Sequence, residues 1–382
     1  MAVKLWYDIT DHDGDTLATF PFEEGTVTYR LSDVGDNGLS ISLKGNPDLT
    51  DTLFGPRRTD FILRLESDVM GTSGTNGNLQ GGICGPVGLK SLDDRVRLRG
   101  VDWLAWLQQP YHFTGYPKDP EDWVQNNVTQ DVIKYWVLES QQTIISDILD
   151  GMYDGTNETI QLTASYGGTG WLEQVDSFMI QIGDTTNVLD SIRAVGQLVE
   201  PYGFDFWCDW DKLIRFYAPR RVTAESAVPI ALFEPSGVNG LVDINWQNNG
   251  PINSSAVGMP TAALMKYHSY APAREQFRNW LEIIQMNEYI RDDFMAQQAT
   301  NDIGGLHSNP QKDNTITYLP DRMDPFDETV GFYNHCGSVV FIDSEDEFRP
   351  YWRIQAPYVI TQQEISAQGS QWIGTMTLDQ IY

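Results

Sequence analysis

The stretch 185–220 constrains the fold more than any other part of this sequence, because it holds a complete small unit of alternating structure. Apolar residues recur there at helical spacing between Val188 and Val199. Thr185 or Thr186, just before them, can accept a hydrogen bond from an unpaired amide of the first turn. A proline and a glycine follow the last apolar position. The pattern therefore predicts a capped helix with a sharp end.

Two short strands are predicted directly after this helix. Residues 204–208 alternate between apolar and polar side chains, residues 209–212 form an acidic turn, and residues 213–217 alternate again. No residue of this helix–strand–turn–strand unit belongs to a known catalytic sequence motif. The unit is interpreted as a structural part of an α+β region.

Residues 1–110 are predicted to be a β domain. Short runs of alternating polar and apolar residues are separated by Gly, Asp and Asn, which is typical of a sandwich or a small barrel. The glycine-rich stretch 71–88 interrupts these runs, and we expect it to be a mobile loop. Near Gly100 the strand pattern gives way to a short helical turn that carries Trp103 and ends before Pro110.

The remainder of the chain is predicted to form two further domains. In residues 111–225, the segments 132–137 and 141–153 have apolar positions at helical spacing, and a glycine-bearing loop follows at 165–170. Residues 226–382 return to strands around an inserted helix at 273–300, whose apolar stripe we expect to pack on its own domain. The chain of 382 residues is thus predicted to be mainly β, with two barrel-like β domains and an α+β connecting region.

The charge of the chain limits its partners. It has 53 acidic and 25 basic residues, a formal net charge of −28. Such a chain repels phosphates and anionic headgroups, so specific binding of nucleic acid or of an anionic membrane is disfavoured. The simplest interpretation is solubility and repulsion within a crowded assembly. Cation sites between carboxylates and an acidic channel wall are the open alternatives.

The cysteines and the hydropathy indicate the compartment. Cys84, Cys208 and Cys336 are far apart and form no CxxC motif, so we expect reduced thiols rather than disulfides or a zinc site. The first residues lack the apolar core of a signal peptide, and no segment reaches about 18 consecutive apolar residues. These features predict synthesis in a cytoplasm and no membrane span.

Three acidic turns have carboxylates at spacings that resemble cation sites. Asp11, Asp13 and Asp15 occupy the first alternate positions of a calcium loop, but Thr16 and Phe22 stand where an EF-hand needs glycine and glutamate. A β-turn with an Asp-Gly corner is the better interpretation. The acidic segments 209–211 and 343–347 are likewise interpreted as hairpin tips first and weak cation sites second.

Signatures of catalysis are missing from the sequence. It contains no GxSxG, HExxH, GxGxxG or GxxxxGK[ST] motif, and His335 beside Cys336 is interpreted as a strand residue. We therefore name no catalytic, cofactor-binding or metal-binding residue and predict a protein that is not an enzyme and has no cofactor. Paired carboxylates brought together by folding leave no local motif, so a carbohydrate-active hydrolase is kept as an alternative.

Three stretches carry a resemblance to a known family. The unit at 185–220, the segment RVRLRGVDWLAWLQQ at 95–109, and the closing strands CGSVVFIDS, YWRIQAPYVITQQ and WIGTMTLDQIY occur in the order found in bacteriophage tail hub proteins. The chain resembles this minor tail or baseplate hub family of long-tailed phages over most of its length.

The resemblance implies a structural role in the virion tail tip. Hubs of this family are homotrimers whose barrel-like domains form a pseudo-hexameric ring that lets DNA pass on ejection. The ring joins the sixfold tail tube and the distal tail protein to the threefold tip fibre or spike, and meets the tape measure protein. On this basis, carboxylates lining the ring would repel DNA. The alternative within the same assembly is the distal tail protein, a hexameric ring that lacks the helix–strand unit.

Overall fold

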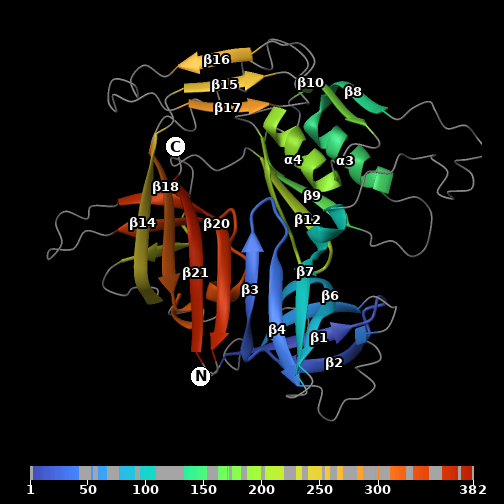
Figure 1. The fold of residues 1–382 in the computed structure, drawn as a ribbon, viewed down its shortest axis with the longest axis vertical. Coiled ribbons are helices and arrows are strands. Elements are labelled where there is room, and N and C mark those ends of the chain that lie inside the picture. Colours follow the sequence, from blue (N-terminus) through green and yellow to red (C-terminus); the bar gives the residue numbers. More distant parts are fainter. Residues whose placement is uncertain are drawn as a thin grey trace, which may run out of the picture.

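A computed structural model shows a mainly β chain with one small helical unit, which confirms the predicted fold class (Figure 1). Strands from the beginning and the end of the chain stand side by side, and the helical unit lies beyond one end of them. The structure describes residues 3–42, 53–54, 59–66, 77–90, 95–108, 133–152, 162–169, 171, 174–181, 187–198, 203–218, 229–234, 240–251, 254–258, 265–269, 282–286, 297, 300, 310–323, 330–343, 355–368 and 371–380.

The N-terminal strands form half of a large sheet of 13 strands. They pair in the order β3-β4-β7-β6-β5-β1-β2. Alternation of burial explains why they are strands: in β7 the arginines at 95, 97 and 99 are exposed while Val96 and Leu98 are buried. Their bounds are β1 (Lys4–Thr10), β2 (Thr16–Pro21), β3 (Glu24–Arg30), β4 (Asp36–Ser42), β5 (Thr59–Glu66), β6 (Asn78–Lys90) and β7 (Arg95–Asp102).

The C-terminal strands continue the same sheet in the order β14-β18-β21-β20, and β20 pairs antiparallel with β3. β19 joins β20, and β13 pairs parallel with β19. The sheet therefore crosses between the segments 1–110 and 226–382. The bounds are β13 (Ala231–Phe233), β14 (Leu241–Pro251), β18 (Pro310–Tyr318), β19 (Val339–Asp343), β20 (Gln355–Gln368) and β21 (Gln371–Gln380), with 3-10 turns η4 (Pro320–Arg322) and η5 (Val330–Phe332).

The described strand pairings do not close a barrel. The path of hydrogen-bonded strands runs from β14 at one end to β2 at the other, and these two strands do not pair with each other. Within the described part of the chain, the predicted barrel-like domains are thus two halves of one curved, open sheet.

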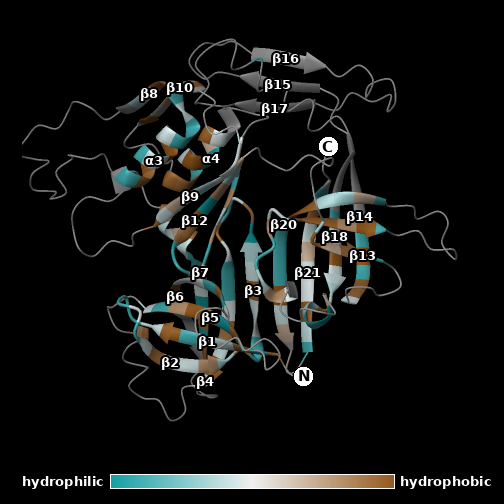
Figure 2. Cartoon of the chain, turned by 180° about the vertical axis from the view of Figure 1, so that it is seen from behind, coloured by the Kyte–Doolittle hydropathy of each residue, from teal (hydrophilic) through white to brown (hydrophobic). Residues whose placement is uncertain are grey.

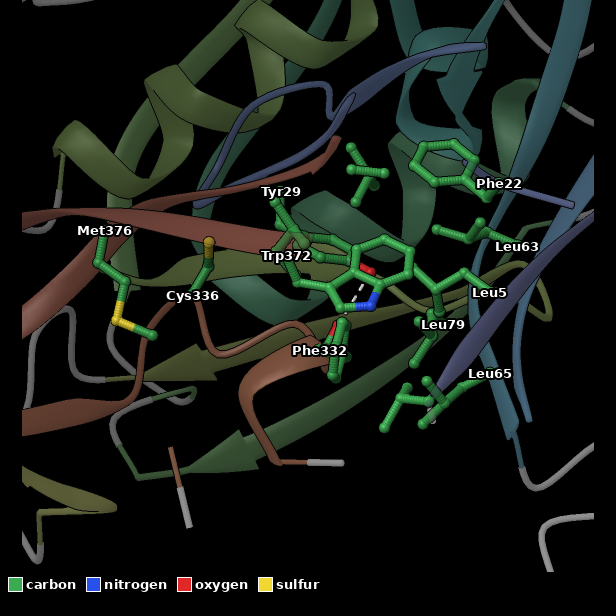
Figure 3. Packing of buried hydrophobic residues seen from close by; sticks show 14 of the residues in the cluster. Leu5, Phe22, Tyr29, Leu63, Leu65, Leu79, Phe332, Cys336, Trp372 and Met376 are labelled. Carbon is green, nitrogen blue, oxygen red and sulfur yellow. Dashed lines mark hydrogen bonds between the residues drawn. The ribbon is translucent and has the colours of Figure 1, made fainter. Parts of the chain in front are cut away.

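One large hydrophobic cluster contains buried residues from both halves of the sheet (Figure 3). Trp372 of β21 and Phe332 of η5 meet edge to face, with ring centroids 5.4 Å apart. The Tyr29 hydroxyl of β3 donates a hydrogen bond of 3.3 Å to the Phe332 carbonyl oxygen. Leu5 and Leu63, from β1 and β5, belong to the same cluster. Residues from both ends of the chain therefore stabilise one core.

The helical unit has a separate core. Helix α3 (Gln141–Met152) and helix α4 (Val188–Leu198) pack together beside a sheet of β11 (Asp205–Cys208), β12 (Leu213–Ala218) and β9 (Thr163–Gly168). β11 and β12 form the predicted antiparallel hairpin, and β9 pairs parallel with β12. A second, two-stranded sheet contains β8 (Ile133–Ser140) and β10 (Gln174–Gln181).

Four sequence predictions are wrong in part. The segment 132–137 was expected to be helical, but β8 pairs with β10 and buries Trp136. The glycine-rich stretch was expected to be a loop, but residues 78–88 belong to β6, which pairs on both sides. The loop expected at 165–170 is in part strand, because residues 165–168 belong to β9.

The fourth is the helix at 273–300. Residues Glu282–Met286 form β17, which pairs parallel with β15 (Ser254–Gly258), and β15 also pairs with β16 (Met265–Ser269). A short apolar run fits either a helix or a strand, and pairing with β15 decides for the strand. Residues 297 and 300 are helical, and the rest of 273–300 lies outside the described residues.

Candidate functional site: the junction between the large sheet and the helical unit

The loop at 31–35, between β3 and β4, joins three parts of the molecule. The Leu31 amide donates a hydrogen bond of 2.9 Å to the Thr361 carbonyl of β20. The Ser32 amide donates one of 2.7 Å to the Phe206 carbonyl of β11. Ser32 has a φ of 56°, a left-handed conformation that is uncommon for a residue other than glycine. We call the region formed by residues 31–35, 102–104 and 206–212 together with Arg193 the junction.

Arg193 of α4 fixes this loop to the helical unit. Its Nε donates to the Ser32 carbonyl oxygen at 2.8 Å, and its two terminal nitrogens pair with the carboxylates of Asp33 and Asp190. The side chain is 30% exposed, so water only partly screens these charges. A guanidinium with three oriented donors suits this position, since its planar fork can hold several acceptors at once.

Replacement of Arg193 by alanine is expected to lower the free energy of unfolding by about 1–2 kcal/mol, because it removes the donor to the Ser32 carbonyl oxygen and the ion pairs with Asp33 and Asp190. Urea unfolding followed by circular dichroism measures the change. Arg95→Ala, which removes an exposed pair with Glu24, is the matched control and should cost less than about 1 kcal/mol. Equal losses in the two variants would contradict a special role for Arg193.

Asp102 connects the end of β7 to the same loop. Its carboxylate accepts the Gly35 amide at 2.7 Å and the Leu104 amide at 3.0 Å. The second bond satisfies the first turn of η2 (Trp103–Gln108). Burial raises the pKa of Asp102 to about 7 and outweighs both the two amide donors and Arg30, which act to lower it. Asp33 raises this pKa further.

The tip of the β11–β12 hairpin packs on β6 and η2. Trp103 Nε1 donates to the Trp210 carbonyl oxygen at 2.9 Å, and Lys212 Nζ lies 4.9 Å from the centroid of the Trp103 ring. A side chain at Gly81 would collide with the Trp210 carbonyl oxygen. Close approach of the hairpin therefore explains a glycine in the middle of β6.

Side chains from the N-terminal segment enter the core of the helical unit. Val34, Trp103, Leu104 and Leu107 are buried in the cluster formed around α3 and α4. Hydrogen bonds and apolar packing thus act at the same place. The large sheet and the helical unit are therefore held together at this place by hydrogen bonds, ion pairs and apolar packing.

The thiols are held in their protonated form. Burial raises the pKa of Cys84 to about 11. Burial and the nearby carboxylates of Asp102, Asp209 and Asp211 raise the pKa of Cys208 well above its usual value. The thiolate is the nucleophilic and metal-binding form, so this environment disfavours both chemistries at neutral pH.

Carboxylates are not assembled as a metal centre in the described segments, which gather no three His, Cys, Asp or Glu side chains as possible ligands. Asp11 Oδ1 instead accepts the amides of Asp13 at 3.0 Å and Asp15 at 2.9 Å. Gly14 has a φ of 90°. This confirms the predicted Asp-Gly turn between β1 and β2.

The structure changes the interpretation of several other residues. The cap of α4 is Asn187, whose Oδ1 accepts the Asp190 amide at 2.8 Å, whereas Thr185 and Thr186 lie outside the described residues. His335 is in the turn before β19 rather than in a strand. The turn at 209–212 is confirmed; of the segment 343–347 only Asp343 is described, and it ends β19.

No helix in the described segments is both long and apolar enough to cross a membrane.

Comparison with known proteins identifies the fold. No protein-family model matches the chain, and no curated protein sequence is significantly similar to it. The tail protein from Neisseria meningitidis MC58 aligns over 100% of this chain and 98% of its own, with a TM-score of 0.64 at 11% identity. The 43 kDa tail protein of prophage MuSo2 from Shewanella oneidensis aligns over 98% and 97%, with a TM-score of 0.58 at 10% identity.

A third similar structure is the prophage tail protein gp18 from Listeria monocytogenes EGD-e, which covers 98% of this chain and 94% of its own, with a TM-score of 0.53 at 8% identity. The chain therefore has the fold of phage tail proteins, as its sequence resemblance implied.

Proposed function

We propose that this protein is a structural component of a phage tail tip, a homotrimeric hub whose β parts form a pseudo-hexameric ring. The hub connects the sixfold tail tube and the distal tail protein to a threefold tip, and DNA passes through it on ejection. The observation that carries this proposal is the match with the Neisseria tail protein over the full length of both chains. A match of this extent includes the large sheet and the helical unit together, not one common module.

The contacts at the junction support a role in which the chain keeps its shape under force. Arg193, Asp102 and the Trp103–Trp210 contact fix the helical unit to the large sheet through charged, polar and apolar contacts at once. A ring that connects two symmetries has to transmit force between neighbours without changing its shape. A subunit whose parts are joined at several points meets this requirement.

In this role the chain needs no catalytic activity. The cysteine thiols are held protonated, and Asp102 uses both of its oxygens to accept backbone amides. The proposed partners are a further two copies of this chain, the distal tail protein, the tail tube, the tape measure protein and the tip fibre or spike. The proposed location is the virion.

Native mass spectrometry of the purified chain, together with negative-stain images, tests the proposal. A species of three copies that forms a ring with threefold symmetry is the expected result. A ring of six copies would favour the distal tail protein instead. A stable monomer that hydrolyses a cell-wall glycan would overturn the structural role in favour of a carbohydrate-active enzyme.

A further inference from the structure

A row of arginines stands on one face of β7, in a chain that is strongly acidic as a whole. Arg95, Arg97 and Arg99 are exposed, whereas Val96 and Leu98 between them are buried in the hydrophobic cluster. Alternate residues of a strand point to the same side, so the three arginines share the opposite side of the sheet. Only 25 of the 382 residues are lysine or arginine, so this row is a local concentration of positive charge. We call the side of β4, β7 and β6 that carries these three arginines the arginine face.

The carboxylates beside the arginine face do not neutralise it. Arg95 pairs with Glu24 of β3 at 2.7 Å. Asp36 of β4 lies 3.8 Å from Arg99, which is longer than a hydrogen bond, and it is also paired at 3.2 Å with a fourth arginine at the end of β3. Arg97, in the middle of the row, forms none of the ion pairs or hydrogen bonds of the described residues. Four arginines therefore meet two carboxylates on this side of β3, β4 and β7.

The strands on either side of β7 leave the arginine face open. Gly38 of β4 and Gly85 of β6 are the neighbours of Arg99 across the sheet, and a serine and a glycine likewise flank Arg97. A Cβ atom at Gly38 or Gly85 would meet no atom within 4 Å beyond its chain neighbours, so packing within the chain does not require either glycine. Neither has a positive φ. A glycine inside a strand weakens it and often marks a place where a ligand or another backbone approaches closely.

The helical unit bounds the arginine face at one end. Val101 follows Arg99 on the same side of β7, and it packs with Ile83 of β6 against the core of the helical unit. Figures 1 and 2 both show β7 ending beside the helical unit. A segment that lies along β7 would therefore have the helical unit at one end and the three arginines along its length.

We propose that the arginine face binds an extended segment rich in aspartate or glutamate that belongs to a different protein. Alternate side chains of an extended chain are about 6.6–6.8 Å apart, which is also the spacing of the arginines along β7. Carboxylates at alternate positions of the segment can therefore each meet one guanidinium, whose fork of donors suits the two carboxylate oxygens. Gly38 and Gly85 leave room for the backbone of the segment to lie close to the sheet.

The charge of the whole chain favours this occupant over two others. Duplex DNA carries one charge per about 1.7 Å, so the field of a chain with a net charge of −28 opposes its approach. A second copy would bring a further net charge of −28 together with its carboxylates. A segment with only a few carboxylates meets the local positive charge with much less of this repulsion. The inference adds a partner surface to the proposed hub and does not depend on the hub function.

A fluorescein-labelled peptide in which aspartate alternates with threonine is the probe for this surface. Fluorescence anisotropy with the full chain in about 50 mM salt should show binding that weakens in about 500 mM salt, because salt screens exposed charges. The same peptide with asparagine in place of each aspartate should not bind. Equal binding of the two peptides, or binding of neither, would overturn the proposal.

Charge reversal at Arg97 locates the site. Arg97→Glu should weaken binding of the aspartate peptide by about tenfold or more, because it places a like charge in the middle of the row. Folding should be retained, since the Arg97 side chain is exposed and has no partner among the described residues. Arg322→Glu, in the exposed turn η4, changes the net charge equally and should change binding by less than about twofold. Equal losses in the two variants would show a general effect of charge and overturn the site.

Gly38→Thr tests the close approach without changing any charge. Threonine suits a strand, and its Cβ atom would meet open space, so far-ultraviolet circular dichroism should show an unchanged fold. The added side chain should overlap the bound segment and weaken binding of the aspartate peptide by about tenfold. Unchanged binding in a folded Gly38→Thr chain would contradict a segment that lies close to the sheet.

The remaining outcomes concern the other occupants and the proposed function. A short DNA duplex that binds more tightly than the aspartate peptide, and loses this binding in Arg97→Glu, would overturn the acidic segment in favour of phosphate. A change of oligomeric state in Arg97→Glu, seen by native mass spectrometry, would overturn it in favour of a second copy. A chain that binds the peptide at Arg97 but forms no ring contradicts the hub function alone. A threefold ring that binds no peptide contradicts this inference alone.

Discussion

Replacement of Trp372 by alanine is expected to lower the free energy of unfolding by about 3–5 kcal/mol. The side chain is 9% exposed, contacts the Phe332 ring edge to face, and lies in the cluster that joins both ends of the chain (Figure 3). Its removal takes away a large apolar area and leaves a cavity that a paired sheet cannot readily fill. Urea unfolding followed by far-ultraviolet circular dichroism measures the loss without relying on tryptophan fluorescence.

Two further variants make this result specific. Trp372→Phe keeps an aromatic ring in the cluster and should lose clearly less stability than the alanine variant. Gln371→Ala, an exposed neighbour in the same strand, should change the free energy by no more than about 0.5 kcal/mol. A loss below about 1 kcal/mol for Trp372→Ala would show that the two ends of the chain do not share one core.

Asp102 is expected to make the stability depend on pH in the opposite direction to most carboxylates. Its pKa is about 7 in the folded chain against an ordinary value of 3.8, so the folded state holds this proton more tightly than the unfolded chain does. The resulting stabilisation is complete below about pH 4 and disappears as the pH rises through 7. Between pH 5 and pH 8 it should fall by about 2–3 kcal/mol.

The variant Asp102→Asn isolates this effect, because its side chain is uncharged at every pH. Asparagine has one acceptor oxygen for the two amides of Gly35 and Leu104, so the variant should be less stable than the wild type at pH 5. The difference should shrink towards pH 8. Asp13→Asn, in the exposed turn after β1, is the control and should follow the wild-type profile. A wild-type advantage that stays constant from pH 5 to 8 would contradict the buried carboxyl.

The parts of the fold that depend on neighbouring residues could be predicted from the sequence. The helix from Val188, the hairpin with its turn at 209–212, and the Asp-Gly turn after β1 all carry their own periodicity and turn residues. So does the passage from strand to helical turn near Trp103. Only the identity of the cap differed, since Asn187 rather than a threonine accepts the first-turn amide.

The parts that depend on distant partners could not be predicted. The glycine content of β6 suggested a loop, but Gly81 is required by the close approach of Trp210 in the β11–β12 hairpin, which follows more than a hundred residues later. β8 and β17 have apolar spacings that also fit a helix, and only pairing with β10 and β15 makes them strands. No pattern in β3 points to β20 as its neighbour.

The junction could not be predicted from the sequence either, because it also depends on contacts between distant residues. Asp102 and Arg193 belong to no motif, and their roles arise only when the loop at 31–35 meets α4 and β11. The only local signal at Asp102 is its position, which lies between the end of a strand and the first turn of a helix. It predicts a cap but not a buried contact with Gly35.

The pairing of β3 with β20 also determines when the large sheet can be completed during synthesis. Thr26 and Ser366 face each other across that pair and are 340 residues apart. At about 5–20 residues per second, the edge of β3 stays unpaired for about 20–70 s after it leaves the ribosome. An open strand edge beside an exposed apolar face favours aggregation. Chains that stop before β20 should therefore be removed by proteolysis or aggregate, whereas finished chains can pair β3 and complete the large sheet.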